Sequence, residues 1–203
     1  MPAIGITGGI GSGKSTCTQI LAATLGAPVF DADVCARRLL ADDAGVAAEV
    51  RAAFGAGVFG ADGRPERSAL RALVFNEDPG PRRTLEAILH PRVREAWRGW
   101  LEERSQADPA APVLVEIPLL YETGAEVYFR QVVVVGCRLE TQVARLTGRR
   151  GLPETVARRI IASQWELPEK IRRCDHLIWN DGSEDGLRAQ AERCARYFQE
   201  AFA

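Results

Sequence analysis

The residues with the clearest chemical meaning lie near the start of the chain, where positions 8–15 have the sequence GGIGSGKS. This stretch matches the pattern G-x-x-x-x-G-K-[ST] without a mismatch. Glycines let successive backbone N–H groups turn inward around an anion, and a following helix adds the positive end of its dipole. Lys14 can then reach the β- and γ-phosphates of a nucleotide, and the Ser15 hydroxyl can bind Mg²⁺. We therefore predict an ATP-type site formed by the loop and the turn after it: Gly9, Gly11, Ser12, Gly13, Lys14, Ser15 and Thr16.

Lys14 is one of only two lysines in the chain, the other being Lys170, beside 24 arginines. Arginine carries a wide planar fork, whereas lysine carries a compact charge on a flexible stem. A chain that uses arginine almost everywhere and keeps lysine at position 14 indicates that this position needs the compact group.

The elements that must position these residues are predicted from apolar runs and turn signals. Strand-like runs occupy residues 3–7, 29–30, 113–118, 131–137 and 176–180. Helical patterns cover residues 14–25, 34–54, 67–106, 139–149, 153–165 and the C-terminal stretch. We expect His90-Pro91 to divide the third of these, because proline disfavours helical geometry in the residue before it. Strands that alternate with helices predict an α/β fold with a five-stranded parallel sheet flanked by helices.

Four polar segments follow the predicted strands directly. They are the glycine loop, DAD at 31–33, EIPLL at 116–120 and GCRLE at 136–140. Ligands of parallel α/β sheets bind at the carboxyl ends of the strands. We therefore expect all four segments at one edge of the sheet.

Length and composition narrow the class of protein. The 203 residues suit a single domain, and a net charge of -1 gives no field that would attract nucleic acid. The longest apolar runs are strand-sized, so no membrane span is predicted. A signal peptide is not predicted either, because the residues near Met1 lack the basic segment that begins one. Five cysteines without C-x-x-C spacing indicate neither a disulfide framework nor a zinc site, and thiols of this kind are typical of a cytoplasmic protein. Nothing in the sequence implies an obligate protein partner.

Several classes of protein share this kind of glycine loop. A GTPase normally also has an N/T-K-x-D tetrapeptide, and the only other lysine, in PEKIRR at 168–173, does not fit it. The chain has no LSGGQ-like signature and is short for a ring-type or transporter ATPase. A phosphotransferase that acts on a small molecule is the class that these observations favour.

TGGIGSGKST (7–16) followed by DADVCARRL (31–39) resembles the dephospho-CoA kinases, and the likeness continues in order along nearly the whole chain. The matching segments are DGRPERSALRALVF (62–75), LEAILHP (85–91), IPLLYE (117–122), RLTGRRGL with RIIASQ (145–164), and CDHLIWNDGS (174–183). The resemblance implies a P-loop NTPase fold over residues 1–203, with a helical acceptor-binding insertion at about 33–110 and a lid at about 139–173. It also implies ATP-dependent phosphorylation of the 3′-hydroxyl of dephospho-CoA with Mg²⁺, the last step of CoA biosynthesis.

The resemblance assigns roles to residues outside the loop. It makes Asp33, the second aspartate of DAD, the base that accepts the hydroxyl proton, although an aspartate there also suits a helix N-cap. Arg145 and Arg149, four positions apart on one helix face, would close over the phosphates as catalytic residues. Arg150 stands where the family often has an acidic residue, so whether Arg149 or Arg150 faces the phosphates stays open. Asn180 would border the adenine of ATP.

Some assignments stay open at the level of sequence. Asp31 can hold either a metal-bound water or a neighbouring side chain, and Glu116 can help to hold Mg²⁺ through water. Trp179 can either stack or pack in the core. His90 is expected to be structural. Two alternative functions remain: another small-metabolite or nucleoside monophosphate kinase, and a regulator that binds a nucleotide without turning it over.

Overall fold

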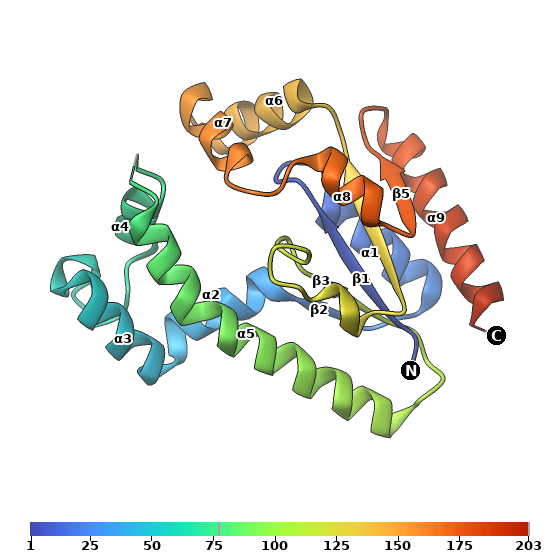
Figure 1. The fold of residues 1–203 in the computed structure, drawn as a ribbon, viewed down its shortest axis with the longest axis horizontal. Coiled ribbons are helices and arrows are strands. Elements are labelled where there is room, and N and C mark those ends of the chain that lie inside the picture. Colours follow the sequence, from blue (N-terminus) through green and yellow to red (C-terminus); the bar gives the residue numbers. More distant parts are fainter. Residues whose placement is uncertain (77, 203) are drawn as a thin grey trace. The chain divides into compact units, whose positions relative to one another are not determined.

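In the computed structural model of the chain, the structure describes residues 1–76 and 78–202. The description does not extend to the side chains of Arg67, Arg149 and Arg150. The described residues form one five-stranded sheet in the order β2-β3-β1-β4-β5, with every pair of strands parallel (Figure 1). The strands are β1 (Ala3–Gly8), β2 (Val29–Asp31), β3 (Val113–Glu116), β4 (Gln131–Gly136) and β5 (His176–Trp179). The predicted strands and their parallel arrangement are therefore confirmed.

The register of the sheet brings polar residues to one edge. Glu116, the last residue of β3, lies opposite Asp31 on β2 and opposite Ile6 on β1. On the other side of β1, Gly8 lies opposite Val135, and Gly136 at the end of β4 lies opposite Trp179. The segments that follow these strands therefore leave the sheet at the same edge, as expected from the sequence.

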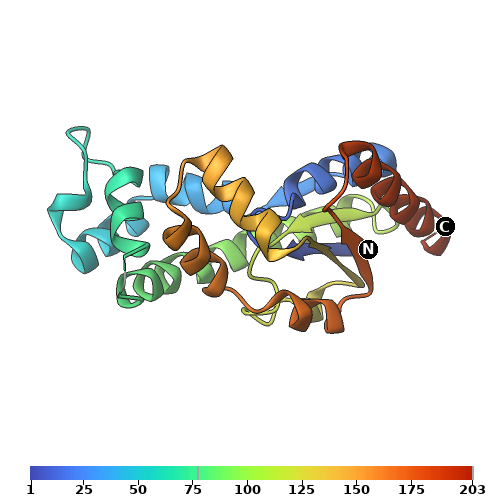
Figure 2. The same cartoon turned by 90° about the horizontal axis from the view of Figure 1, so that it is seen from above.

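Helices cover both faces of the sheet, and Figure 2 shows α1 and α9 on one face and α8 on the other. The helices are α1 (Lys14–Leu25), α2 (Ala32–Asp42), α3 (Ala44–Phe54), η1 (Ala56–Val58), α4 (Arg67–Val74), α5 (Gly80–Ala107), η2 (Glu126–Tyr128), α6 (Leu139–Arg150), α7 (Glu154–Ala162), α8 (Leu167–Arg173) and α9 (Glu184–Ala201). Among the described residues, no helix combines the length and the apolar content needed to cross a bilayer.

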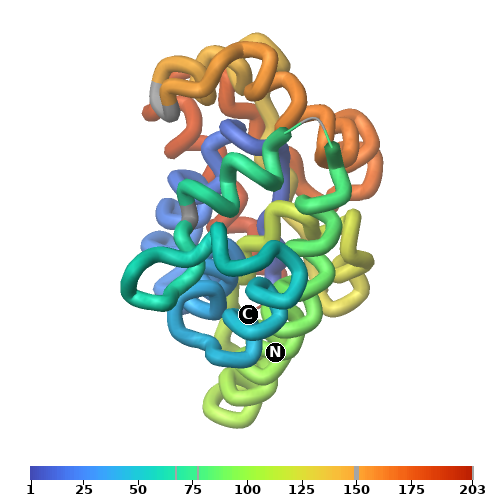
Figure 3. The backbone as a smooth tube through the Cα atoms, turned by 90° about the vertical axis from the view of Figure 1, so that its left-hand side faces the viewer, coloured from blue at the N-terminus to red at the C-terminus, as the bar shows by residue number. Residues whose placement is uncertain are grey.

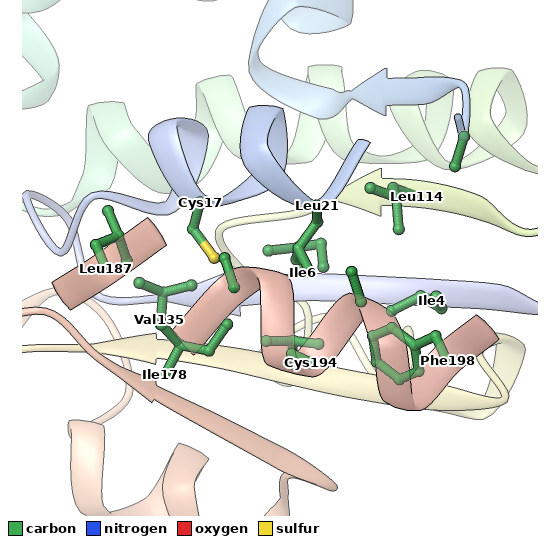
Figure 4. Packing of buried hydrophobic residues seen from close by; sticks show 14 residues of the cluster. Ile4, Ile6, Cys17, Leu21, Leu114, Val135, Ile178, Leu187, Cys194 and Phe198 are labelled. Carbon is green, nitrogen blue, oxygen red and sulfur yellow. The ribbon is translucent and has the colours of Figure 1, made fainter. Parts of the chain in front are cut away.

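The main core lies between the sheet and the pair α1 and α9. Cys17 and Leu21 of α1 lie in one cluster with Ile6 of the central strand and with Cys194 and Phe198 of α9 (Figure 4). Burial of apolar side chains of this size contributes about 1.5–3 kcal/mol each. This packing fixes α1, and therefore the loop before it, against the end of β1.

The chain divides into two compact units. The first comprises residues 1–31 and 100–203 and contains the sheet, and the second comprises residues 32–99. The second unit is helical, and its parts can be followed in Figure 3 from light blue to green. Its core joins Val46 and Val50 of α3 to Leu70 of α4 and Leu89 of α5. This unit overlaps most of the segment at about 33–110 that the resemblance assigns to acceptor binding, and that assignment stays a prediction.

Two helical segments differ from the sequence-based expectation. Helix α5 runs through Pro91 without a break, although His90-Pro91 was expected to divide it. Proline in a helix interior costs about 3 kcal/mol, and buried side chains on both sides of it, including Leu89 and Trp97, outweigh that cost. The sequence placed one helix at 153–165, where the structure has α7 at Glu154–Ala162. The separate helix α8 at Leu167–Arg173, whose second residue is Pro168, was not predicted.

Candidate active site

The glycine loop joins β1 to α1 and depends on glycine at two of its positions. Gly8 has φ 146° and Gly13 has φ 91°, in the region that side chains rarely adopt. A Cβ atom at Gly8 would lie 2.1 Å from the Val135 carbonyl oxygen, and one at Gly13 would lie 2.2 Å from Asn180 Nδ2. The loop therefore packs so closely against its neighbours that only glycine fits.

The loop has the polar groups of an anion site. Lys14 is buried, and its Nζ donates to the carbonyl oxygens of Gly8 at 3.2 Å and Gly9 at 3.1 Å, so its side chain folds back over the loop. None of the described side chains caps the start of α1, which leaves the N–H groups of its first turn for an anion. Ser12 Oγ is buried without a hydrogen-bond partner among the described residues. The binding of ATP by these residues stays a prediction.

Oxygen donors suited to Mg²⁺ lie beside the loop. The Ser15 hydroxyl donates to Glu116 Oε1 at 2.8 Å, and Glu116 is only 5% exposed. Asp31 stands next to Glu116 on the neighbouring strand. Mg²⁺ prefers oxygen ligands, keeps several waters and takes others from phosphates. One hydroxyl and two carboxylates at this edge therefore fit a magnesium ion held together with a nucleotide.

Arg145 connects α6 to the loop. Its Nη1 donates to the Gly11 carbonyl at 3.0 Å, and its Nη2 donates to the Asn180 carbonyl at 2.9 Å. The guanidinium therefore lies against the loop at which the phosphates are expected. The side chain of Arg149 lies outside the described residues, as does that of Arg150, so the choice between them is not tested.

Asn180 is part of the support of the loop. Its side chain is 7% exposed, and Nδ2 donates to the Ser12 carbonyl at 2.8 Å. Its backbone N–H donates to the Gly136 carbonyl at 2.7 Å. Asn180 thus joins the ends of β4 and β5 to the loop, a role that the sequence did not indicate, and its contact with adenine stays a prediction. Its neighbour Trp179 is 37% exposed and packs against Gly136.

Two glutamines that the sequence analysis did not select also reach the loop. Gln164 Oε1 accepts a hydrogen bond from the Ile10 N–H at 2.9 Å. Gln142 is 4% exposed, and a Cβ atom at Gly9 would lie only 2.0 Å from Gln142 Nε2. The only signal in the sequence was that both glutamines belong to the predicted lid.

Asp33 belongs to the second unit. It is exposed and lies in the first turn of α2, two residues after the end of β2. The positive end of the helix dipole favours the charged carboxylate there. Its role as the base stays a prediction. His90, in the same unit, is half-buried, and burial lowers the pKa of its imidazole.

The buried cysteines do not supply a nucleophile. Burial raises the pKa of Cys17 and of Cys194 to about 12, and that of Cys137 to about 11. A thiol needs a pKa near or below the ambient pH to be reactive. These three thiols are therefore not candidates for the chemistry at this edge of the sheet.

Comparisons with known proteins agree on one family. A family model described as dephospho-CoA kinase matches residues 2–185. A protein named dephospho-CoA kinase from Symbiobacterium thermophilum is 45% identical over 197 residues, which cover 97% of this chain and 81% of that protein.

Two solved structures also match the fold of the chain over nearly its whole length. A structure titled TT1252 from Thermus thermophilus superposes with a TM-score of 0.76 at 37% identity and covers 97% of this chain and 96% of that one. A structure titled dephospho-CoA kinase from Campylobacter jejuni gives a TM-score of 0.64 at 25% identity, with 96% of each chain covered.

Proposed function

Because the chain belongs to the dephospho-CoA kinase family, we propose that it transfers the γ-phosphoryl group of ATP to the ribose 3′-hydroxyl of dephospho-CoA. The products are CoA and ADP. One observation carries the proposal: a buried lysine folds over a glycine loop, beside a serine bonded to Glu116, in a chain that matches the family over residues 2–185. All five cysteines are free thiols, which suits a reaction in the cytoplasm.

The first unit supplies the groups for ATP. The loop N–H groups and Lys14 bind the β- and γ-phosphates, and Arg145 adds positive charge from α6. Ser15, with Glu116 and Asp31, would hold Mg²⁺, which when bound neutralises part of the negative charge on the β- and γ-oxygens. Phosphoryl transfer needs little covalent help, so positioning and charge neutralisation account for most of the catalysis.

The proton leaves through Asp33. The 3′-oxygen forms a bond to the γ-phosphorus while the bond from that phosphorus to the β,γ-bridging oxygen breaks. The electron pair stays on the β-phosphate of ADP, and the hydroxyl proton passes to the Asp33 carboxylate. The acceptor is assigned to the second unit, in which Asp33 lies in the first turn of α2.

The test is a product assay with a panel of acceptors. Purified protein with Mg-ATP and dephospho-CoA should release one ADP for each CoA formed, with the product identified by mass spectrometry. CoA is the matched control because its 3′-position is already phosphorylated, and Lys14→Met is the inactive enzyme control. ADP release no higher than in the absence of acceptor would reject the proposal. Faster turnover of AMP or adenosine would instead favour a nucleoside or nucleoside monophosphate kinase.

A further inference from the structure

Lys170, the second lysine of the chain, is completely buried and has no part in the reaction described above. Its side chain is 0% exposed, and its Nζ lies 2.8 Å from Glu122 Oε1 and 3.1 Å from the Pro118 carbonyl oxygen. A buried ammonium persists only when it is paired and hydrogen-bonded. A compact charge reaches two oxygens of one turn, whereas the wider arginine used almost everywhere else would not fit equivalently.

The two oxygens belong to the turn that follows β3, and that turn contacts the strand that leads into the glycine loop. The Pro118 carbonyl that accepts from Lys170 also accepts from Thr7 Oγ1 at 3.1 Å. Thr7 directly precedes Gly8. Lys170 is therefore connected to the base of the loop through one shared carbonyl.

Glu122 makes the second connection. The same Oε1 that pairs with Lys170 accepts from the Trp165 backbone N–H at 2.9 Å. The Trp165 ring stacks on the Tyr121 ring, with 6.4 Å between the ring centres, and the Arg173 guanidinium lies 4.7 Å from the Trp165 ring centre. The backbone at position 165 is thus fixed from several directions.

The residue before Trp165 is Gln164, whose Oε1 accepts the Ile10 N–H of the loop. The hydrogen bonds form a continuous path from Lys170 through Glu122 and the 164–165 backbone to the apex of the loop. None of these groups has the chemistry to transfer a phosphoryl group, and all of them lie in the first unit.

We propose that Gln164 is a positioning residue that orders the glycine loop for ATP. Glu122 holds Gln164 in place by accepting from the Trp165 N–H, and the buried Lys170 balances the charge of Glu122. The Ile10 peptide would otherwise rotate freely in a loop rich in glycine, and ordering it before binding removes an entropic cost from binding ATP. The inference deepens the proposed kinase function, yet it concerns ATP binding alone and does not depend on the acceptor.

The first test is Gln164→Met, which keeps the length of the side chain and removes the acceptor oxygen. ATP affinity, measured by titration calorimetry on the full chain, should fall about three- to tenfold, as expected for one lost hydrogen bond. The KM for dephospho-CoA should stay within about twofold. The matched control is Gln199→Met, which removes a single hydrogen bond from α9 to the Thr24 carbonyl, at a distance from the loop in sequence and on another helix.

A second test uses the buried pair, in which single changes would leave an unpaired charge. Lys170→Met/Glu122→Gln keeps an acceptor oxygen at position 122 for the Trp165 N–H, whereas Lys170→Met/Glu122→Leu removes it. The first double variant should bind ATP within about twofold of wild type, and the second should lose as much affinity as Gln164→Met. Adding Gln164→Met to the second variant should cause no further loss, because both changes break the same path.

Three results would overturn the inference. They are unchanged ATP affinity in Gln164→Met, an equal loss in Gln199→Met, and additive losses in the combined variant. A wild-type protein that binds ATP but does not phosphorylate dephospho-CoA would reject the proposed function and leave this comparison valid.

Discussion

At the scale of the residue, a few side chains both form the candidate site and hold it in place. Lys14 is held by two loop carbonyls, and Arg145 is held by Gly11 and Asn180 carbonyls. These hydrogen bonds hold both cations against the glycine loop. In the proposed reaction such oriented cations and dipoles stabilise the phosphates with little reorganisation.

Asp33→Asn tests the base. The amide keeps the size of the side chain but cannot accept the proton, so kcat should fall more than about tenfold, equivalent to about 1.4 kcal/mol of barrier. ATP affinity should stay near wild type, because Lys14 and the loop are unchanged. Asp42→Asn at the other end of α2 is the control, since Asp42 is exposed and forms a 3.9 Å ion pair with the exposed Arg64. A fall in kcat of less than tenfold would remove Asp33 from the mechanism.

At the scale of the element, the loop is fixed by close contacts on both of its sides. Gly8 contacts β4, and Gly13 contacts the Asn180 side chain that follows β5. Residues that support the loop come from the ends of three strands, from α6 and from the segment after α7. The loop therefore behaves as part of the sheet edge, although its composition suggests flexibility.

A comparison of Gly13→Ala with Gly26→Ala distinguishes an effect on the glycine loop from an effect on helix α1. Both glycines flank α1 with positive φ, 91° and 63°, so each alanine should cost about 1–2 kcal/mol of stability. Only at Gly13 would the new methyl meet Asn180 Nδ2, whereas nothing lies within 4 Å at Gly26. ATP affinity should therefore fall at least about tenfold in Gly13→Ala and stay unchanged in Gly26→Ala. Equal affinities by calorimetry would show that this close contact is unimportant.

The second prediction at this scale concerns motion of the predicted lid, which contains α6 and α7. We expect α6 and α7 to become better protected from hydrogen exchange when ATP binds, because kinases exclude water before transfer. The amides of Gln164 and Trp165 should already be protected without ATP, since they donate to the Ile161 carbonyl and to Glu122 Oε1. The buried part of α9 is the internal reference. Identical exchange of α6 and α7 with and without ATP would contradict a closing lid.

At the scale of the whole molecule, the chain divides into two compact units, and the proposed reaction gives each unit a separate task. The sheet unit contains the loop, Arg145 and the oxygen donors, and the helical unit contains Asp33. In the proposed reaction, the first unit binds the donor and the second binds the acceptor. Each unit also contains one of the two histidines, His176 and His90.

Stability of both units should fall below about pH 6.5. Burial lowers the pKa of His90 and of His176 in the folded chain. The unfolded chain then binds more protons near pH 6.5, so the free energy of unfolding rises with pH there and falls as the pH drops toward the folded pKa values. Thermal unfolding should therefore give a lower Tm at pH 5.5 than at pH 7.5. The dependence should weaken in His90→Asn/His176→Gln, and a Tm that is constant in wild type would contradict the prediction.

Much of the fold could be predicted from the sequence because it depends on local patterns. The loop residues are contiguous, and the apolar runs at residues 113–118 and 131–137 indicated buried parallel strands. Pro91 shows the limit of such reasoning: a local rule predicted a break, and packing of the residues around it kept α5 continuous. Asn180 shows another limit, because its link to Ser12 requires knowledge of which strand lies beside β4.

The sequence by itself determined the phosphate loop, the class of fold and the family, since each depends on residue types at fixed spacing along the chain. Only the tertiary structure decided what holds that loop. Ile10 and Gln164 are hydrogen-bonded although 154 positions separate them in the sequence, and Ser12 and Asn180 are hydrogen-bonded across a separation of 168. Contacts over such separations depend on strand order, on packing and on the burial of one lysine. These are properties of the folded chain, and no local pattern of residues encodes them.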